Sequence, residues 1–264
     1  RFLQANPRVK VEIQGHVNGP TFKNTKEFIE LSTARAKTVY DFLIVNDIEP
    51  DRISFVGLGN YTALLSEPRF WYDLGNTFLL VGISVALQLF IGLALALALY
   101  ACTRGVRLIS LLNFLPHVVT PVVGGIFLKW MFVGRWGLLD ATLISFNIFP
   151  PDWLGDPWWA KFTVIMADTW KFMPFLMLVL YAGLQSFDTS LLEAASIDGA
   201  NAWQRLRYII LPMMKPIILF VVAIRTMDAF RFFDLIYVLT NGGPGTATET
   251  ITLYTYQLGF RLLE

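Results

Sequence analysis

The sequence predicts a mainly α-helical fold: a polytopic helical membrane protein preceded by a small, partial α/β unit. Of its 264 residues, 55% are apolar and 16% are charged, whereas about 25% of an ordinary soluble domain is charged. The first 58 residues are rich in charge, because they hold 15 of the 41 charged side chains. Two later runs hold no charged side chain. We therefore expect a soluble unit over 1–58 and a membrane domain over 59–264.

Four membrane spans are expected in the second part of the chain. The uncharged runs 74–103 and 108–128 contain 30 and 21 residues, and roughly 20 helical residues cross the hydrocarbon core of a bilayer. A third span is expected over about 163–184, where Asp168 and Lys171 interrupt an apolar stretch. A fourth is expected over about 216–240.

The fourth predicted span carries four charges that alternate in sign at a spacing of three: Arg225, Asp228, Arg231 and Asp234. A charge at the bilayer centre costs about 2.5–3.5 kcal/mol on insertion scales. Residues three apart share one side of a helix, so neighbours can form ion pairs. Two interpretations remain open. Either the outer half of the helix lies near the interface, or the helix faces a bundle interior or an aqueous path.

The segment between the third and fourth spans predicts a short helix on the membrane surface. Asp188 or Ser190 can cap it, and Gly199 can end it with a positive φ. A second helical stretch follows, and Pro212 is expected at the start of the next span. Lys and Arg near span ends favour the cytoplasm, and this loop carries Arg205, Arg207 and Lys215.

This loop resembles the cytoplasmic loop of the membrane subunits of binding-protein-dependent ABC importers. The residues that carry the resemblance are Glu193-Ala194-Ala195-Ser196-Ile197-Asp198-Gly199 and, nine residues later, Ile209-Ile210-Leu211-Pro212. Further segments resemble the sugar-importing branch of the maltose and glycerol-phosphate type: Phe55–Tyr61, Arg69-Phe70-Trp71, Gly75-Asn76-Thr77 and Asn241–Thr246. The resemblance covers about residues 55–264.

The resemblance implies an inner-membrane permease subunit that is not an enzyme and carries no cofactor, with ATP bound by a partner. The ATPase-coupling residues would be Glu193, Ala194, Ala195, Asp198, Gly199, Leu211 and Pro212. The partners would be ABC ATPase subunits, a second permease subunit, a periplasmic solute-binding protein and membrane lipid. The family normally has about six spans, so the four predicted here indicate a truncated permease domain, without the first span and with the last one cut short.

Residues 1–58 predict a strand over 9–14, a helix over 25–45 and a strand over 52–56, which is typical of a small α/β unit. They resemble the C-terminal half of an OmpA-like peptidoglycan-binding domain in Asn6-Pro7, Val11–Asn18, Leu31-Ser32-x-x-Arg35-Ala36 and Arg52-Ile53. The resemblance implies a cell-wall site at Asn18 and Arg35. Asn18 stands where the family has an Asp, so binding would be weaker or altered. The unit would lie in the periplasm.

The join between the two resemblances has no linker. The run Ile53–Asn60 fits the end of one family and the start of the other, although natural fusions usually contain a flexible connection. The alternatives are a chimeric or artefactual fusion without an intact function, a genuine fusion, and a cell-wall-binding membrane anchor.

Several site types are excluded or disfavoured by the sequence. A net charge of +1 argues against a nucleic-acid partner, and Cys102 alone forms no intramolecular disulfide. The sequence contains no Gly-x-x-x-x-Gly-Lys-Ser/Thr loop for ATP. His16 and His117 fall in different halves, so they offer no metal pair. We expect His16 to be structural and His117 to hydrogen-bond a neighbouring helix.

Overall fold

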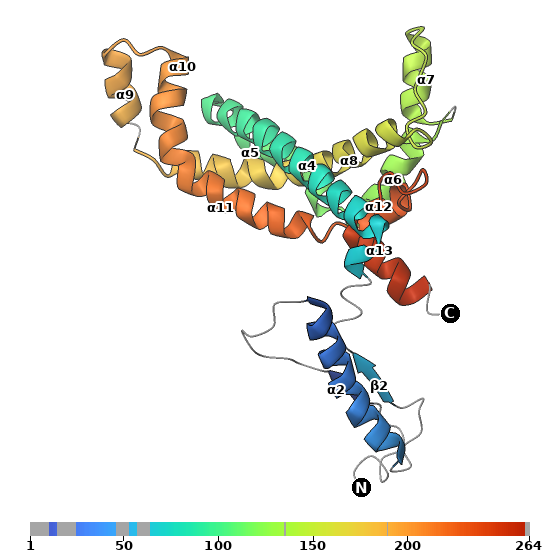
Figure 1. Cartoon of the computed structure of the whole chain (residues 1–264). Helices are drawn as coiled ribbons and strands as arrows, with labels where there is room; N and C mark the ends of the chain where they lie inside the picture. Colours follow the sequence, from blue (N-terminus) through green and yellow to red (C-terminus); the bar gives the residue numbers. More distant parts are fainter. Residues whose placement is uncertain are drawn as a thin grey trace. The chain divides into compact units, whose positions relative to one another are not determined.

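The computed structural model describes residues 11–14, 25–45, 53–56 and 64–261, apart from 135 and 189. The chain forms two compact units, residues 1–71 and 72–264 (Figure 1). Their positions relative to one another are not determined, so each is described by itself.

The first unit has the predicted order strand, helix, strand. Strand β1 (Val11–Gln14) and strand β2 (Ile53–Val56) pair in parallel, with Val11 opposite Ile53. Helix α2 (Thr25–Val45) connects them, as a parallel pair requires a crossover. Ala36 of α2 is 1% exposed.

Among the described residues, three helices are long and apolar enough to cross a membrane. They are α4 (Pro68–Ala101), α8 (Pro157–Gln185) and a continuous helix over Ala202–Ala229. The last consists of α10 (Ala202–Arg205), the π-helical turn η2 (Leu206–Ile210) and α11 (Leu211–Ala229). The predicted third span lies within α8, and the predicted first span, 74–103, lies within α4 except for residues 102 and 103.

The predicted second span is a sharply bent pair of helices instead of one straight helix. Helix α5 (Val106–Val118) and helix α6 (Pro121–Phe132) meet at 94°. The cause is Pro121, because a residue before proline is biased away from the helical region. Thr120, the residue before it, is extended accordingly, and Val119 is extended as well. The number of spans among the described residues is therefore three, or four if the bent pair counts as one.

The predicted fourth span was wrong at both ends. The helix in this region starts at Ala202 and ends at Ala229. A break over 230–233 follows, and then helix α12 (Asp234–Leu239). The hydroxyl groups of Thr250 and Thr252 each donate to the carbonyl of Phe232, at 3.3 Å. The Phe232 carbonyl therefore accepts from side chains of a later segment, whereas in a continuous helix it would accept a backbone N–H of the same helix.

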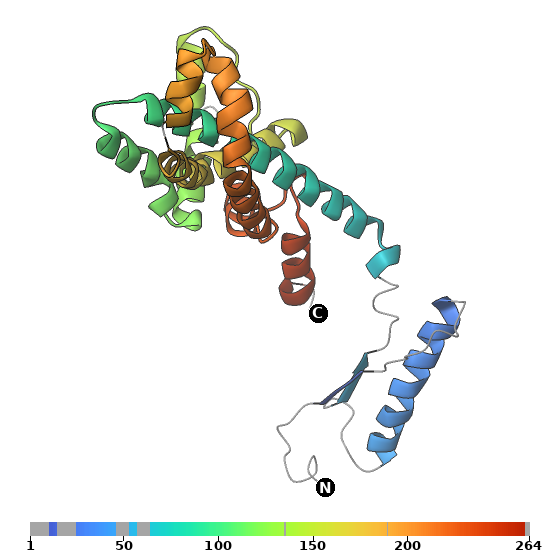
Figure 2. The same ribbon diagram turned by 90° about the vertical axis from the view of Figure 1, so that its left-hand side faces the viewer.

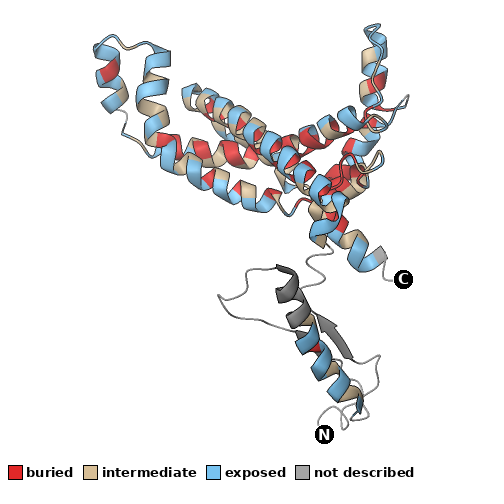
Figure 3. Ribbon diagram, in the orientation of Figure 1, coloured by how far each residue is buried: buried red, intermediate tan, exposed pale blue. Residues whose placement is uncertain are grey.

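The remaining helices of the second unit are α7 (Leu138–Ser145), α9 (Ser190–Ile197), α13 (Ile251–Tyr256) and the π-helical turn η3 (Gln257–Arg261). In Figures 1 and 2, α9 and α10 form a hairpin that leads into α11. Buried residues gather along α8 (Figure 3). Helix α5 has none, and Leu108, Leu111, Leu112 and Leu115 on it are each more than half exposed. Such a surface suits contact with lipid.

Candidate functional site: a buried charge network and an exposed loop

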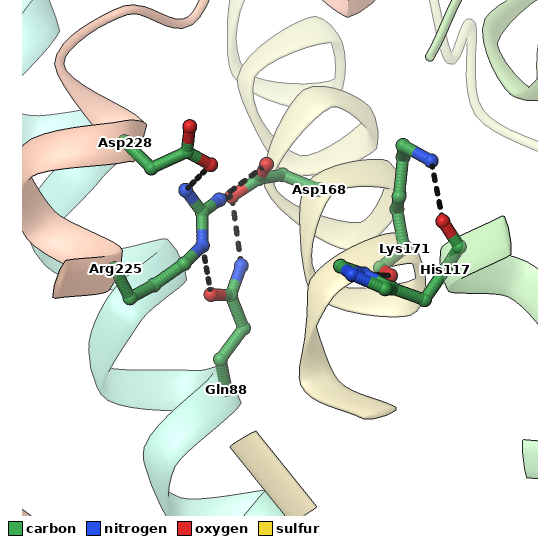
Figure 4. A network of polar contacts seen from close by, with 6 residues as sticks. All are labelled: Gln88, His117, Asp168, Lys171, Arg225 and Asp228. Atoms are coloured by element: carbon green, nitrogen blue, oxygen red, sulfur yellow. Dashed lines mark hydrogen bonds and ion pairs between the residues drawn. The ribbon is translucent and has the colours of Figure 1, made fainter. Parts of the chain in front are cut away.

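A buried polar network joins three of the long helices (Figure 4). Arg225 of α11 places Nη2 at 2.6 and 2.7 Å from the two carboxylate oxygens of Asp168 on α8. Its Nε donates to Oε1 of Gln88 on α4 at 2.8 Å. Gln88 Nε2 in turn donates to Asp168 Oδ2 at 2.7 Å. All three residues are at most 2% exposed, so each charge is both paired and hydrogen-bonded.

The four charges predicted on one helix do not stay on one helix. Arg225 is buried, and its Nη1 lies 3.3 Å from Asp228 Oδ2, which is the predicted pairing at a spacing of three. Arg231 falls in the break after α11 and Asp234 begins α12. Sequence reasoning missed Gln88 as a partner, and it noted Asp168 only as an interruption. Both residues are polar positions inside apolar runs, and such positions indicate a buried polar partner.

Asp168 and Arg225 of the network line one side of a cavity of about 210 Å³. Five charged residues border it: Asp168, Arg225, Asp228, Arg231 and Asp234. The guanidinium carbon of Arg225 lies 4.0 Å from the ring centre of Phe172, which also borders the cavity. Arg225 is buried between α4 and α8, whereas Asp228, Arg231 and Asp234 are exposed at the cavity.

Lys171, one helical turn after Asp168 on α8, bonds to the bend between α5 and α6. Its Nζ donates to the backbone carbonyl of Val119 and, at 3.4 Å, to that of His117. These carbonyls lie at the end of α5, where helical partners are missing. His117 Nδ1 lies 3.3 Å from the carbonyl of Lys171, so the expected contact with a neighbouring helix is confirmed.

The predicted loop helix is present as α9. Glu193 and Ala194 are exposed and Ala195 is 9% exposed. Gly199, exposed beside Asp198, has a φ of 81°, which is the positive φ expected of it.

Both ends of α9 are fixed by local hydrogen bonds. Asp188 accepts a hydrogen bond from the backbone N–H of Ser190 at 3.0 Å, and this contact lowers the pKa of the Asp188 carboxyl. Arg205 Nη1 donates to Ser196 Oγ at 2.6 Å and thereby joins α10 to α9.

Leu211 and Pro212 lie inside the long helix, so Pro212 does not start a span as predicted. The π-helical turn η2 comes immediately before them, and the N–H of Leu211 bonds to the carbonyl of Leu206. Proline removes one hydrogen bond from a helix, and the wider turn accommodates it. Asn201 and Gln204 form a capping box where this long helix begins.

Two segments that are far apart in the sequence meet at the other side of the unit. Asn76 Nδ2 donates to the carbonyls of Thr246 and Ala247, at 3.2 and 3.1 Å. Thr77 Oγ1 accepts from the backbone N–H of Ile251 at 2.9 Å. The glycine-rich turn before Thr246 has positive φ at Asn241, Gly242 and Gly245. The structure thus joins two of the segments that carried the permease resemblance.

Of the two residues expected to form the cell-wall site, the structure describes only Arg35. Arg35 lies exposed on α2, whereas Asn18 and His16 lie outside the described residues.

Comparison with known proteins decides the family. The model for "Binding-protein-dependent transport system inner membrane component" matches residues 55–262. The chain belongs to this family. The trehalose/maltose transport system permease protein MalF of Thermococcus litoralis is 40% identical over 202 residues, covering 76% of this chain and 68% of the relative. The lactose transport system permease protein LacF of Rhizobium radiobacter is 37% identical, covering 80% and 72%. The chain is therefore a multi-pass inner-membrane component of the sugar permease type.

Two solved structures share the fold. A bacterial alginate ABC transporter in complex with an alginate pentasaccharide-bound periplasmic protein matches with a TM-score of 0.71 and 25% identity. The match covers 78% of this chain and 73% of that one. A second alginate importer structure matches with a TM-score of 0.72 over 89% of this chain, at 23% identity.

The model for the OmpA family matches residues 1–70, so both resemblances are confirmed. The two matches overlap over residues 55–70, which includes residues 55–60 of the run that fits both families.

Proposed function

We propose that the chain is the permease subunit of an ABC importer for a sugar or a related small solute. In this proposal α9 couples it to an ATP-hydrolysing subunit in the cytoplasm. A second permease subunit completes the solute path, and a periplasmic binding protein delivers the solute. The cavity beside Arg225 belongs to that path.

The observation that carries the proposal is the exposure of Glu193 and Ala194 on a short helix that is fixed at both ends. A docking helix needs an accessible face and a defined orientation. The bond between Arg205 and Ser196 links α9 to α10, which continues through η2 into α11. A movement of α9 would therefore pass through this bond into a membrane helix.

ATP-driven uptake into proteoliposomes tests the proposal. The full chain is reconstituted with its ATPase subunits, second permease subunit and binding protein, and radiolabelled trehalose and maltose serve as probes. We expect accumulation of at least one sugar that requires ATP, the binding protein and an intact α9. Equal uptake without ATP or without the binding protein would contradict the proposal.

A second candidate function is favoured by the OmpA family match over residues 1–70. In this proposal the first unit lies in the periplasm, binds peptidoglycan and tethers the chain to the cell wall. Sedimentation of the detergent-solubilised full chain with purified peptidoglycan tests it. We expect binding that Arg35→Ala weakens and Lys37→Ala does not. Equal loss in both variants, or no binding, would contradict it.

The join can be tested separately. Sequencing single long DNA molecules across the codons for residues 40–80 shows whether one molecule carries both family segments. Molecules with both segments in frame favour the tethered permease. Their absence would mean that the OmpA-like part is artefactual and would leave the permease proposal standing.

A further inference from the structure

The coupling loop and the charged cavity are connected by one continuous helix. This helix runs from Ala202 to Ala229 and is about 40 Å long at 1.5 Å per residue. Its first turn carries Arg205, which binds α9. Its last turns carry Arg225 and Asp228, which border the cavity.

The α11 part of this helix packs against the rest of the unit mainly through apolar side chains, among them the partly buried Ile217, Ile218 and Val222. Its buried residues are Met214, Val221, Arg225 and Ala229. Of these four, Arg225 alone is charged, and its contacts are directional where those of the others are apolar. Arg225 reaches α8 through Asp168 and α4 through Gln88, so it fixes the far end of the helix against two others.

The chain changes direction just beyond this attachment. Helix α11 ends at Ala229, and the break over 230–233 contributes Arg231, Phe232 and Phe233 to the cavity wall. A rotation of the long helix about Arg225 would move this break, and with it the cavity wall. A helix that slid past α8 would shift the break along the helix axis instead of swinging it about a fixed point.

We propose that Arg225 is a positioning residue for import: its bonds to Asp168 and Gln88 form the pivot that turns movement of α9 into movement of the cavity wall. This rests on the proposed function. The pivot depends on the shape of the guanidinium group as well as on its charge. Nε, Nη1 and Nη2 each contact a different side chain: Gln88, Asp228 and Asp168. A lysine ammonium keeps the charge but loses this planar fork.

The test measures sugar taken up per ATP hydrolysed, in the same proteoliposomes, for the wild type and Arg225→Lys. We expect uptake to fall more than hydrolysis, so that this ratio drops about fivefold or more, the lower end of typical coupling between sites. A residue that only stabilises the fold would lower both rates together. An unchanged ratio in folded Arg225→Lys transporter would overturn the proposal.

Asp140→Asn is the matched control. Asp140 is 3% exposed and accepts a 2.7 Å bond from Trp153 Nε1, and neither residue lies on the long helix. We expect its uptake and hydrolysis to change in parallel. If Arg225→Lys does not fold, the double variant Asp168→Asn/Arg225→Gln removes both charges, and we expect the same drop in the ratio.

A readout that is independent of the sugar separates the two proposals. If the wild type takes up neither trehalose nor maltose, the assignment of the solute fails. The pivot is then judged from the stimulation of ATP hydrolysis by the binding protein. We expect Arg225→Lys to retain its unstimulated ATP hydrolysis and to lose most of the stimulation, and full stimulation in that variant would overturn the pivot.

Discussion

The buried network around Arg225 and the exposed helix α9 differ in what determines them. The network is built from three helices whose contributing residues are up to 137 positions apart in sequence, and its side chains are almost completely buried. Helix α9 is eight residues long and is fixed mainly by neighbours in the sequence. The first depends on the tertiary fold as a whole, whereas the second depends on local hydrogen bonds and a glycine turn.

The same difference decides what could be predicted from the sequence. Around α9, a cap at Asp188 or Ser190 and a positive φ at Gly199 were predicted from residue type; Asp188 accepts a hydrogen bond from the N–H of Ser190, and Gly199 has the positive φ. The pairing of Arg225 with Asp168 was not, because nothing in the local spacing tells which helix faces which. The bend at Pro121 was missed for another reason. An uncharged run of 21 residues looks like one span until the effect of proline on the preceding residue is considered.

Removal of Asp168 should give the largest effect on stability. Asp168→Ala leaves the Arg225 guanidinium buried without its main partner, and we expect a loss of about 3–5 kcal/mol of unfolding free energy. Asp228→Ala is the control, since the Asp228 side chain is 51% exposed and exposed pairs contribute about 0–1 kcal/mol. Unfolding in mixed micelles measures both. Similar losses in the two variants would show that burial does not distinguish these contacts.

Loss of the capping box should have a smaller and local effect. Asn201→Ala removes the side chain that accepts from the backbone N–H of Gln204 at 2.9 Å, and we expect a loss of about 1 kcal/mol at the start of the long helix. Amide hydrogen exchange should be faster over residues 202–206 and unchanged around Arg225. Faster exchange at both places would mean that the start of the long helix and the network are not independently stable.

The smallest effect concerns pH. The bond from the backbone N–H of Ser190 holds the pKa of Asp188 below its ordinary value of 3.8. A carboxyl group with a lowered folded pKa stabilises the fold above its unfolded pKa, and this contribution is lost as the pH falls through the folded pKa. We therefore expect faster amide exchange in α9 below about pH 4. Asp188→Asn should remove this pH dependence, and a dependence that persists would assign it to another group.

Association with the ATPase subunit is the most direct test of the account. The full chain and its Glu193→Arg variant are each purified from membranes by an affinity tag, and the amount of bound ATPase subunit is measured. Thr142→Arg adds a positive charge at an exposed position of α7 and serves as the control. We expect the wild type and Thr142→Arg to retain the ATPase subunit and Glu193→Arg to lose most of it. Full retention by Glu193→Arg would contradict the assignment of α9 as the coupling helix.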